Sequence, residues 1–223
     1  MIYVTGDMHG DITRFKDKAI KKLRRGDTLI VCGDFGFVWD HSAQEQKLLQ
    51  WIGKRRFNTL FIDGTHDNLD LLAEYPLTQW QGGPVRVISG RLMQLQRGHI
   101  YNIEDSTVFA MGGGESHDAE LRQQSKTWWH NEMPTPDELE QARENLEAYR
   151  GVVDYIVTHD CPGSLRSCVD SAETVSHLGA FFNNMQQQCR YKKWFFGAYH
   201  QDKQIPPYYY ALYKDVVPVR TQR

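Results

Sequence analysis

The stretch IYVTGDMH, residues 2–9, is a short apolar run that ends in a glycine, an aspartate and a histidine. Four later apolar runs also end in a small residue followed by carboxylate or imidazole side chains: Leu29–Asp34, Leu60–Asp67, Tyr155–Asp160 and Trp194–His200. Apolar runs of this length predict buried β-strands. Because the ligand crevice of an open α/β sheet lies beyond the carboxyl ends of its strands, we expect these five ends to converge. Converging aspartate and histidine side chains indicate a metal site.

Helical patterns alternate with the apolar runs along most of the chain, which predicts an α/β fold. Between Val85 and Met111 the pattern changes to short runs separated by turn residues, which indicates a meander of antiparallel strands in a second sheet. Thr135, Pro136 and Glu138 predict a helix that starts with a capping box and an early proline. The other expected elements are helices between Asp11 and Gly26, from Ser42 to Gly53 and from about Ala172 to Gln188, and strands at Val152–Val157, Trp194–Phe196 and Tyr208–Tyr213.

Length and composition exclude several classes of protein. The 223 residues, 40% of them hydrophobic, are enough for one large domain, which we place at residues 1–223. The 26 Lys and Arg against 28 Asp and Glu give a net charge of −2, which argues against a nucleic-acid or membrane partner. The four cysteines show no CxxC spacing, and we recognise no signal peptide or long apolar segment, so we expect a cytoplasmic protein with reduced cysteines.

The order of the five strand-end motifs resembles that of the calcineurin-like metallophosphoesterase family. The family pattern is Asp-x-His, Gly-Asp, Gly-Asn-His-Asp/Glu, a lone His and Gly-His-x-His, and the resemblance covers residues 2 to about 202, spacing included. It implies a sandwich of two mostly mixed β-sheets flanked by helices, in an αββα arrangement. It also implies a metal-dependent phosphoesterase that hydrolyses a phosphate mono- or diester with a metal-activated water. A small phosphorylated molecule or a nucleotide is the expected substrate, and the sequence predicts no oligomeric state.

The resemblance also implies a set of metal ligands. Asp7, His9 and His200 would hold a first metal ion, Asp34 would bridge two ions, and His159 would bind the second. Two cations about 3.5–4 Å apart can clamp a phosphoryl group and lower the pKa of a bridging water. The mixed Asp and His donors suit Mn²⁺, our first choice, or Fe²⁺, Zn²⁺ or Ni²⁺, rather than Ca²⁺.

Two positions depart from the family pattern, and both belong to the second metal. Thr65 replaces the asparagine that binds metal and phosphate in the family, and Ala198 replaces the first histidine of the final motif. A threonine hydroxyl is a poor ligand and alanine has no lone pair, so we expect one tight site and one weak site. Asp160 or a water molecule is a possible substitute ligand at the weak site.

The resemblance assigns His66, next to Asp67, to the histidine that contacts the scissile phosphate and assists the leaving group. We therefore interpret both residues as catalytic, with the alternative that Asp67 caps the following helix. Retention of this pair favours hydrolysis. Two other functions stay open. One is a catalytically degraded protein that binds a phosphate ligand or a partner. The other is a mononuclear-metal enzyme of different chemistry, built on Asp7, His9 and His200.

Several residues are candidates for contact with the substrate. They are Thr65, His117 and Arg122, together with the glycine-rich turn at residues 112–114. Backbone amides of such a turn can cradle a phosphate, although a triple glycine is also common in a simple tight turn. Trp128 and Trp129 follow and could form an aromatic lid over a base or aryl group, or serve as core anchors.

Overall fold

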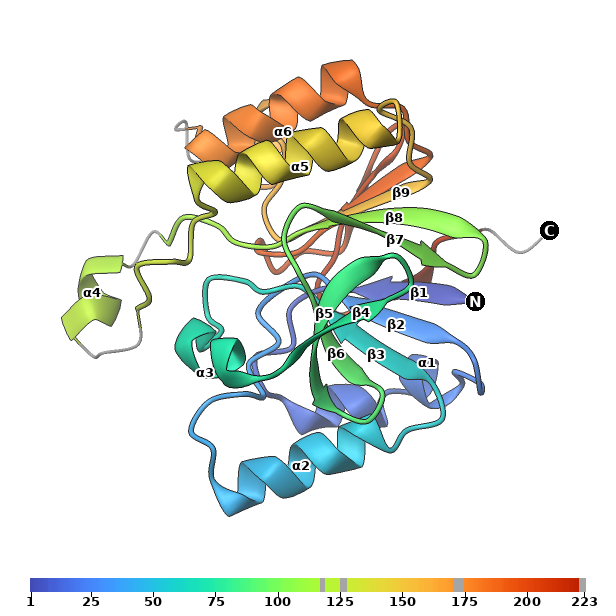
Figure 1. Cartoon of the computed structure of the whole chain (residues 1–223), viewed down its shortest axis with the longest axis vertical. Coiled ribbons are helices and arrows are strands. Elements are labelled where there is room, and N and C mark those ends of the chain that lie inside the picture. The colour runs from blue at the N-terminus through green and yellow to red at the C-terminus, as the bar shows by residue number, and fades with distance from the viewer. Residues whose placement is uncertain (117–118, 125–127, 171–174, 221–223) are drawn as a thin grey trace.

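Two β-sheets lie face to face in the centre of the fold, with helices on both outer sides (Figure 1). The computed structural model describes residues 1–116, 119–124, 128–170 and 175–220. The layers follow the order helix, sheet, sheet, helix. This arrangement confirms the α/β class and the sandwich of two mixed sheets.

The first sheet has seven strands in the order β13-β1-β2-β3-β6-β5-β4. In that order the strands are β13 (Val216–Pro218), β1 (Ile2–Thr5), β2 (Thr28–Val31), β3 (Asn58–Phe61), β6 (Leu92–Leu95), β5 (Gly83–Ser89) and β4 (Leu77–Trp80). Strands β1, β2, β3 and β6 run parallel, whereas β13 and β5 pair antiparallel with their neighbours. The carboxyl ends of β1, β2 and β3 therefore lie at the same edge of this sheet.

The second sheet has six strands in the order β11-β12-β10-β9-β8-β7. They are β11 (Lys203–Ile205), β12 (Tyr209–Ala211), β10 (Lys193–Phe196), β9 (Tyr155–Thr158), β8 (Ser106–Met111) and β7 (His99–Ile103). Strands β12, β10, β9 and β8 are parallel, and both edge strands are antiparallel to their neighbours. The carboxyl ends of β9 and β10 are therefore adjacent.

The expected meander between Val85 and Met111 is divided between the two sheets, so its assignment to one second sheet was wrong. Strand β6 pairs in parallel with β3, and β5 pairs antiparallel with β6, so both strands belong to the first sheet. The β7–β8 hairpin instead pairs with β9 in the second sheet. The local sequence marks where strands occur, but their partners are chosen by contacts between distant parts of the chain.

Helices cover both outer faces (Figure 1). The described helical segments are η1 (Ile12–Lys16), α1 (Lys18–Lys21), α2 (Ala43–Gly53), α3 (Leu69–Glu74), α4 (Ala119–Gln124), α5 (Pro136–Ala148), η2 (Gly163–Cys168) and α6 (His177–Gln188). Of these, α4 lies away from the sheets (Figure 1). Both hydrogen bonds of the predicted capping box are present at Thr135 and Glu138. The single helix expected between Asp11 and Gly26 is broken, because the Asp17 side chain accepts a hydrogen bond from the Ala19 N–H and starts a new turn.

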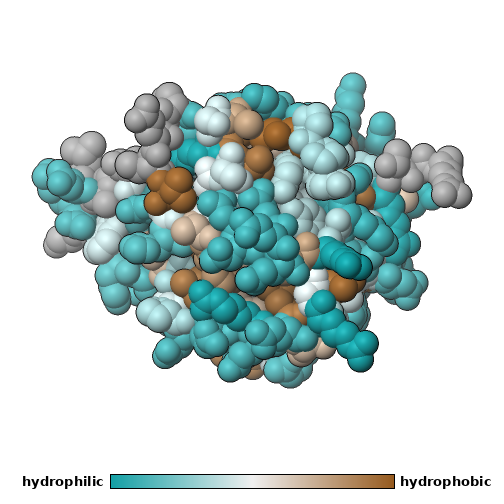
Figure 2. Space-filling model, turned by 90° about the horizontal axis from the view of Figure 1, so that it is seen from above, coloured by the Kyte–Doolittle hydropathy of each residue, from teal (hydrophilic) through white to brown (hydrophobic). Residues whose placement is uncertain are grey.

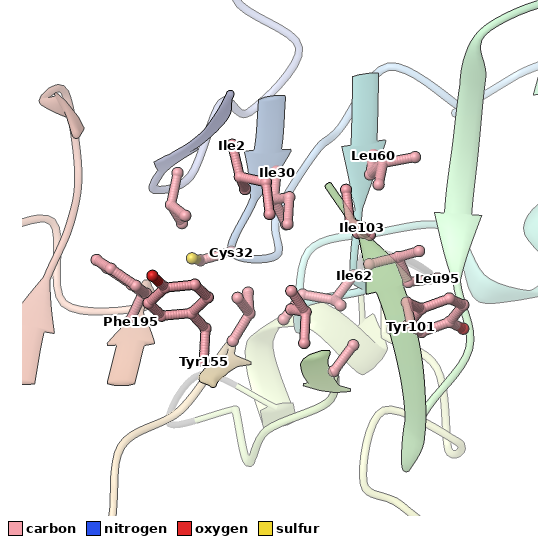
Figure 3. Packing of buried hydrophobic residues seen from close by; sticks show 14 of the residues in the cluster. Ile2, Ile30, Cys32, Leu60, Ile62, Leu95, Tyr101, Ile103, Tyr155 and Phe195 are labelled. Atoms are coloured by element: carbon pink, nitrogen blue, oxygen red, sulfur yellow. The ribbon is translucent and has the colours of Figure 1, made fainter. Parts of the chain in front are cut away.

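Apolar side chains fill the spaces between the layers. Between the sheets, Ile30 of the first sheet faces a layer that includes Tyr155 and Phe195 of the second (Figure 3). The adjacent residues of β2, Leu29 and Val31, pack instead in a second cluster under the helices of the first sheet. Because β2 is buried on both faces, it reads as a continuous apolar run rather than an alternating one.

The surface seen from above, on the side of α5 and α6, is mostly hydrophilic with hydrophobic residues interspersed (Figure 2). Among the described residues, no helix has both the length and the apolar character needed to cross a membrane. All four cysteines are free.

Candidate metal centre

Four of the five predicted strand ends supply the candidate metal ligands of one cluster, and the fifth, after β3, supplies His66, whose Nδ1 lies 2.9 Å from Oδ2 of Asp34. Asp7 and His9 follow β1, Asp34 follows β2, His159 follows β9 and His200 follows β10. The Nε2 atom of His159, from the second sheet, lies 3.6 Å from Oδ1 of Asp34, from the first. The ends of parallel strands in two different sheets therefore meet at one point, as the sequence pattern predicts.

Asp7, His9 and His200 form the tightest part of this cluster. The Nε2 atoms of the two histidines lie 2.8 Å apart, and that of His200 lies 3.3 Å from Oδ2 of Asp7. One ligand atom from each of the three residues lies within 4.8 Å of the others. This is the grouping that the sequence predicts for the first metal.

The Asp7 carboxylate provides a direct test of whether a metal fits. Its side chain is fully buried, and its Oδ1 accepts a hydrogen bond from the Ala198 N–H at 3.1 Å. Within the described part of the chain, its Oδ2 has no hydrogen-bond donor. This buried carboxylate oxygen lies beside two imidazole nitrogens and lacks a hydrogen-bond donor among the described residues. A divalent cation would supply the missing partner. The residues present therefore fit a metal ion.

Asp34 lies between this group and His159. Its Oδ2 is 3.9 Å from Nε2 of His9, and its Oδ1 is 3.6 Å from Nε2 of His159. The Nδ1 atom of His159 lies 2.9 Å from the Cys32 carbonyl oxygen. Because a carbonyl can only accept, Nδ1 carries the hydrogen and Nε2 faces Asp34. This geometry suits a bridging Asp34 and a second site that includes His159.

The charge of each of these groups depends on its neighbours in the cluster. Burial opposes a charge on Asp34, but His159 and the hydrogen bonds from His66 outweigh it and hold the pKa of Asp34 well below its usual range. Burial also opposes a charge on His159, but Asp34 and Asp7 raise its pKa to about 9. Burial lowers the pKa of His9, whereas the Asp7 carboxylate raises that of His200. A metal ion bound by His159 would therefore displace a proton at neutral pH.

The backbone around the cluster adopts a conformation that few residues other than glycine tolerate. His9, Asp34, Ala198 and His200 all have positive φ angles, between 45° and 65°. Such residues concentrate at functional sites, where the surrounding structure holds them in place. Gly33 shows how close the packing is, because a Cβ atom there would overlap the His159 ring. The turns at the strand ends therefore bring the ligands together.

His66 is oriented by Asp34 rather than by its neighbour in sequence. The His66 N–H donates to Oδ1 of Asp34 at 2.7 Å, and its Nδ1 lies 2.9 Å from Oδ2. A carboxylate only accepts hydrogen bonds, so Nδ1 carries the hydrogen. The Thr65 hydroxyl lies 3.0 Å from the same Nδ1. The His66 side chain is 44% exposed, so a substrate can reach it.

Asp67 is buried and holds two loops together. Its carboxylate accepts hydrogen bonds from the backbone N–H groups of Phe35, Gly36 and Gly64, at 3.2, 2.7 and 2.9 Å. Burial and the nearby Asp34 raise the pKa of Asp67 to about 7, although the N–H donors oppose this. The alternative in which Asp67 caps the next helix was wrong, because Asn68 is the residue that caps α3.

A cleft of about 400 Å³ opens beside the cluster. Its lining includes Thr65, His66, Gly114, Ser116, Arg166 and His200. Sequence reasoning missed Arg166, which lies in the short helix η2 and belongs to no motif. Asp160 also lines the cleft, but one oxygen of its carboxylate accepts a hydrogen bond from the Tyr199 hydroxyl.

The remaining candidates for substrate contact have mixed outcomes. His117 lies outside the described residues, and only the backbone of Arg122 is described, within α4. The N–H groups of Gly113 and Gly114 donate to carbonyl oxygens of the protein itself, which is typical of a tight turn rather than a phosphate cradle. Trp129 is buried against Trp39, which favours the interpretation of Trp129 as a core anchor.

Comparison with known proteins gives one match. The family model described as calcineurin-like phosphoesterase matches residues 1–201, which is most of the chain and includes all five strand-end motifs. No curated protein and no solved structure matches the chain.

Proposed function

The chain belongs to the calcineurin-like phosphoesterase family, and from this premise we propose that it hydrolyses phosphate esters with one tightly bound and one weakly bound divalent metal ion. The observation that carries the proposal is the buried Oδ2 of Asp7, which lacks a donor among the described residues and lies beside Nε2 of His200. Members of this family use divalent metals, and the donor set here suits that use.

The tight ion would be held by Asp7, His9 and His200, with Asp34 as the ligand that bridges to the weak ion. Asp34 and His159 would hold the weak ion, because Thr65 and Ala198 supply no comparable ligand. Mn²⁺ is our first choice of metal. A bound ion would activate water for attack and stabilise the charge that develops on the phosphoryl oxygens.

Side chains of the protein itself would protonate the leaving group. Asp34 fixes the His66 ring through Nδ1, so Nε2 is the nitrogen that would deliver a proton to the departing oxygen. Thr65 helps to hold the same ring. Asp67 acts indirectly, because its carboxylate fixes the loops that carry Asp34 and His66. We therefore assign Asp67 a positioning role.

The cleft favours a small substrate. Its volume of about 400 Å³ matches the size of pockets that hold small organic ligands. The net charge of −2 gives no broad attraction for a nucleic-acid backbone. A small phosphorylated molecule or a nucleotide is therefore the proposed substrate class.

The test combines metal analysis with turnover of an aryl phosphomonoester and an aryl phosphodiester in excess Mn²⁺. We expect one tightly held ion per chain, measurable turnover, and a loss of turnover of about 100-fold or more in His66→Ala with unchanged metal content. His41→Ala is the matched control, because His41 lies near Glu74 at the end of α3 and does not line the cleft.

Two results would contradict the proposal. Two tightly bound ions in protein purified without added metal would exclude the weak second site. One bound ion without turnover of either ester would favour one of the two alternatives, a catalytically degraded binding protein or a mononuclear-metal enzyme. The grouping of one carboxylate and two histidines supports the second of these.

A further inference from the structure

Arg166 lies almost buried in the wall of the cleft. The residue is 7% exposed, and its Nε and Nη2 atoms donate to Oδ2 of Asp170 at 3.3 and 3.1 Å. Its Cζ atom lies 5.6 Å from the centre of the Tyr199 ring. The ion pair and the aromatic ring therefore hold the guanidinium in a defined position.

The contacts of Arg166 place it on the side of the weak metal site. Tyr199, which packs against the guanidinium, directly follows Ala198, the position where a metal-binding histidine is missing. The Tyr199 hydroxyl donates to Asp160, which directly follows His159. Arg166 is thus connected to both chain segments that form this site.

The charges of the site call for a further cation. A single divalent ion is balanced by the two carboxylates of Asp7 and Asp34. Glu115, Asp160 and Asp170 also line the cleft, so an anionic phosphate ester needs a cationic side chain to contact. Among the described residues that line the cleft, Arg166 is the one Lys or Arg. Its guanidinium keeps its charge at any physiological pH and carries five N–H donors, the group that proteins commonly use to bind phosphate oxygens.

We propose that Arg166 binds the phosphate group of the substrate on the side of the weak metal site. Asp170 orients the guanidinium from the wall of the cleft. This inference rests on the proposed function, because it concerns the same site, but it predicts a binding property that can be measured without turnover.

The experiment uses the full chain loaded with its tight metal ion, with free metal removed, and measures binding of inorganic phosphate by calorimetry. We expect Arg166→Met to weaken phosphate binding about 10-fold or more, and Arg166→Lys to weaken it less, because lysine keeps the charge but loses the fork. Metal content should stay unchanged in both variants. Arg143→Met is the matched control, because Arg143 is an exposed residue of α5 that pairs with Glu140.

The outcomes separate this inference from the proposed function. Phosphate binding that is absent in the wild type, or equally strong in folded Arg166 variants, would overturn the inference and leave Arg166 a structural residue. If Arg166→Met does not fold, phosphate binding by Arg166→Lys is the measurement that decides: weaker binding than in the wild type supports the inference, and equal binding overturns it. If the wild type binds phosphate through Arg166 but hydrolyses no ester, the inference holds and the proposed hydrolysis fails.

Discussion

Individual residues of the site differ in how clearly the sequence identifies them. Asp7, His9, Asp34, His159 and His200 could be predicted because each follows a buried strand in a recognisable order, and the structure brings all five together. Arg166 could not be predicted, since it lies in the short helix η2, outside every motif, and reaches the cleft only through the tertiary fold. Asp67 could be singled out beside His66, but its role in holding two loops could not be predicted, because its partners are backbone N–H groups that no sequence pattern reveals.

The pKa of His159 predicts how the stability of metal-free protein depends on pH. A histidine whose pKa rises from about 6.5 to about 9 on folding stabilises the protein fully below pH 6.5 and loses this effect as pH rises through 9. We therefore expect chelator-treated protein to lose roughly 1–3 kcal/mol of unfolding free energy between pH 6.5 and 9. Urea denaturation at several pH values measures this loss.

His159→Gln is the comparison that isolates the effect, because it removes the titrating group and keeps a hydrogen-bonding side chain. The difference in unfolding free energy between wild type and variant should shrink as pH rises. A difference that is constant from pH 6.5 to 9 would show that His159 is not charged in the metal-free fold.

At the level of elements, α4 lies outward from the two sheets, between β8 and α5 in chain order (Figure 1). The base of this segment is closed by Glu132, whose carboxylate accepts hydrogen bonds from the N–H and hydroxyl of Ser116 at 2.9 and 2.7 Å. Arg97, paired with Asp63, donates to the Glu132 carbonyl at 3.0 Å. Because Ser116 lines the cleft, this closure shapes the substrate site.

We expect Glu132→Gln to raise KM for a phosphoester several-fold with little change in metal content, since the metal ligands lie on other elements. The variant loses a charge-assisted hydrogen bond of about 1.5–3 kcal/mol that holds the Ser116 turn. Limited proteolysis should also cut the segment faster. Glu120→Gln, at an exposed position of α4, is the control. Equal KM values for the two variants would argue that the closure does not shape the cleft.

For the whole molecule, the sequence predicts the layers better than the pairing within them. The buried strands and the helix at Thr135 follow from apolar runs and capping residues, which act locally. The transfer of β5 and β6 to the first sheet depends on the pairing of Leu92 with Thr59, and this contact has no local signature. The break at Asp17 was missed because the aspartate competes with the helical pattern around it.

The weak site also belongs to this scale, because its two altered positions come from different sheets. Thr65 follows β3 of the first sheet and Ala198 follows β10 of the second. We expect the double change Thr65→Asn and Ala198→His to raise the tightly bound metal from one to two ions per chain and to increase phosphodiester turnover. Elemental analysis and an aryl phosphodiester assay measure the two effects.

Each single change serves as a control for the pair, since one restored ligand should raise metal content less than two. A metal count that stays at one in the folded double variant would show that the weak site is limited by something other than these ligands.

The separation of the metal ligands along the chain has a consequence for biosynthesis. His9 and His200 meet although 191 positions separate them in the sequence. During synthesis the first sheet can assemble its central strands while Asp7 still lacks its partner from the second sheet. Metal capture would thus require β10 to dock beside β9, and a bound ion would link segments that lie 191 positions apart in the sequence. A bound ion would therefore be present only in molecules in which the strand ends of both sheets have come together.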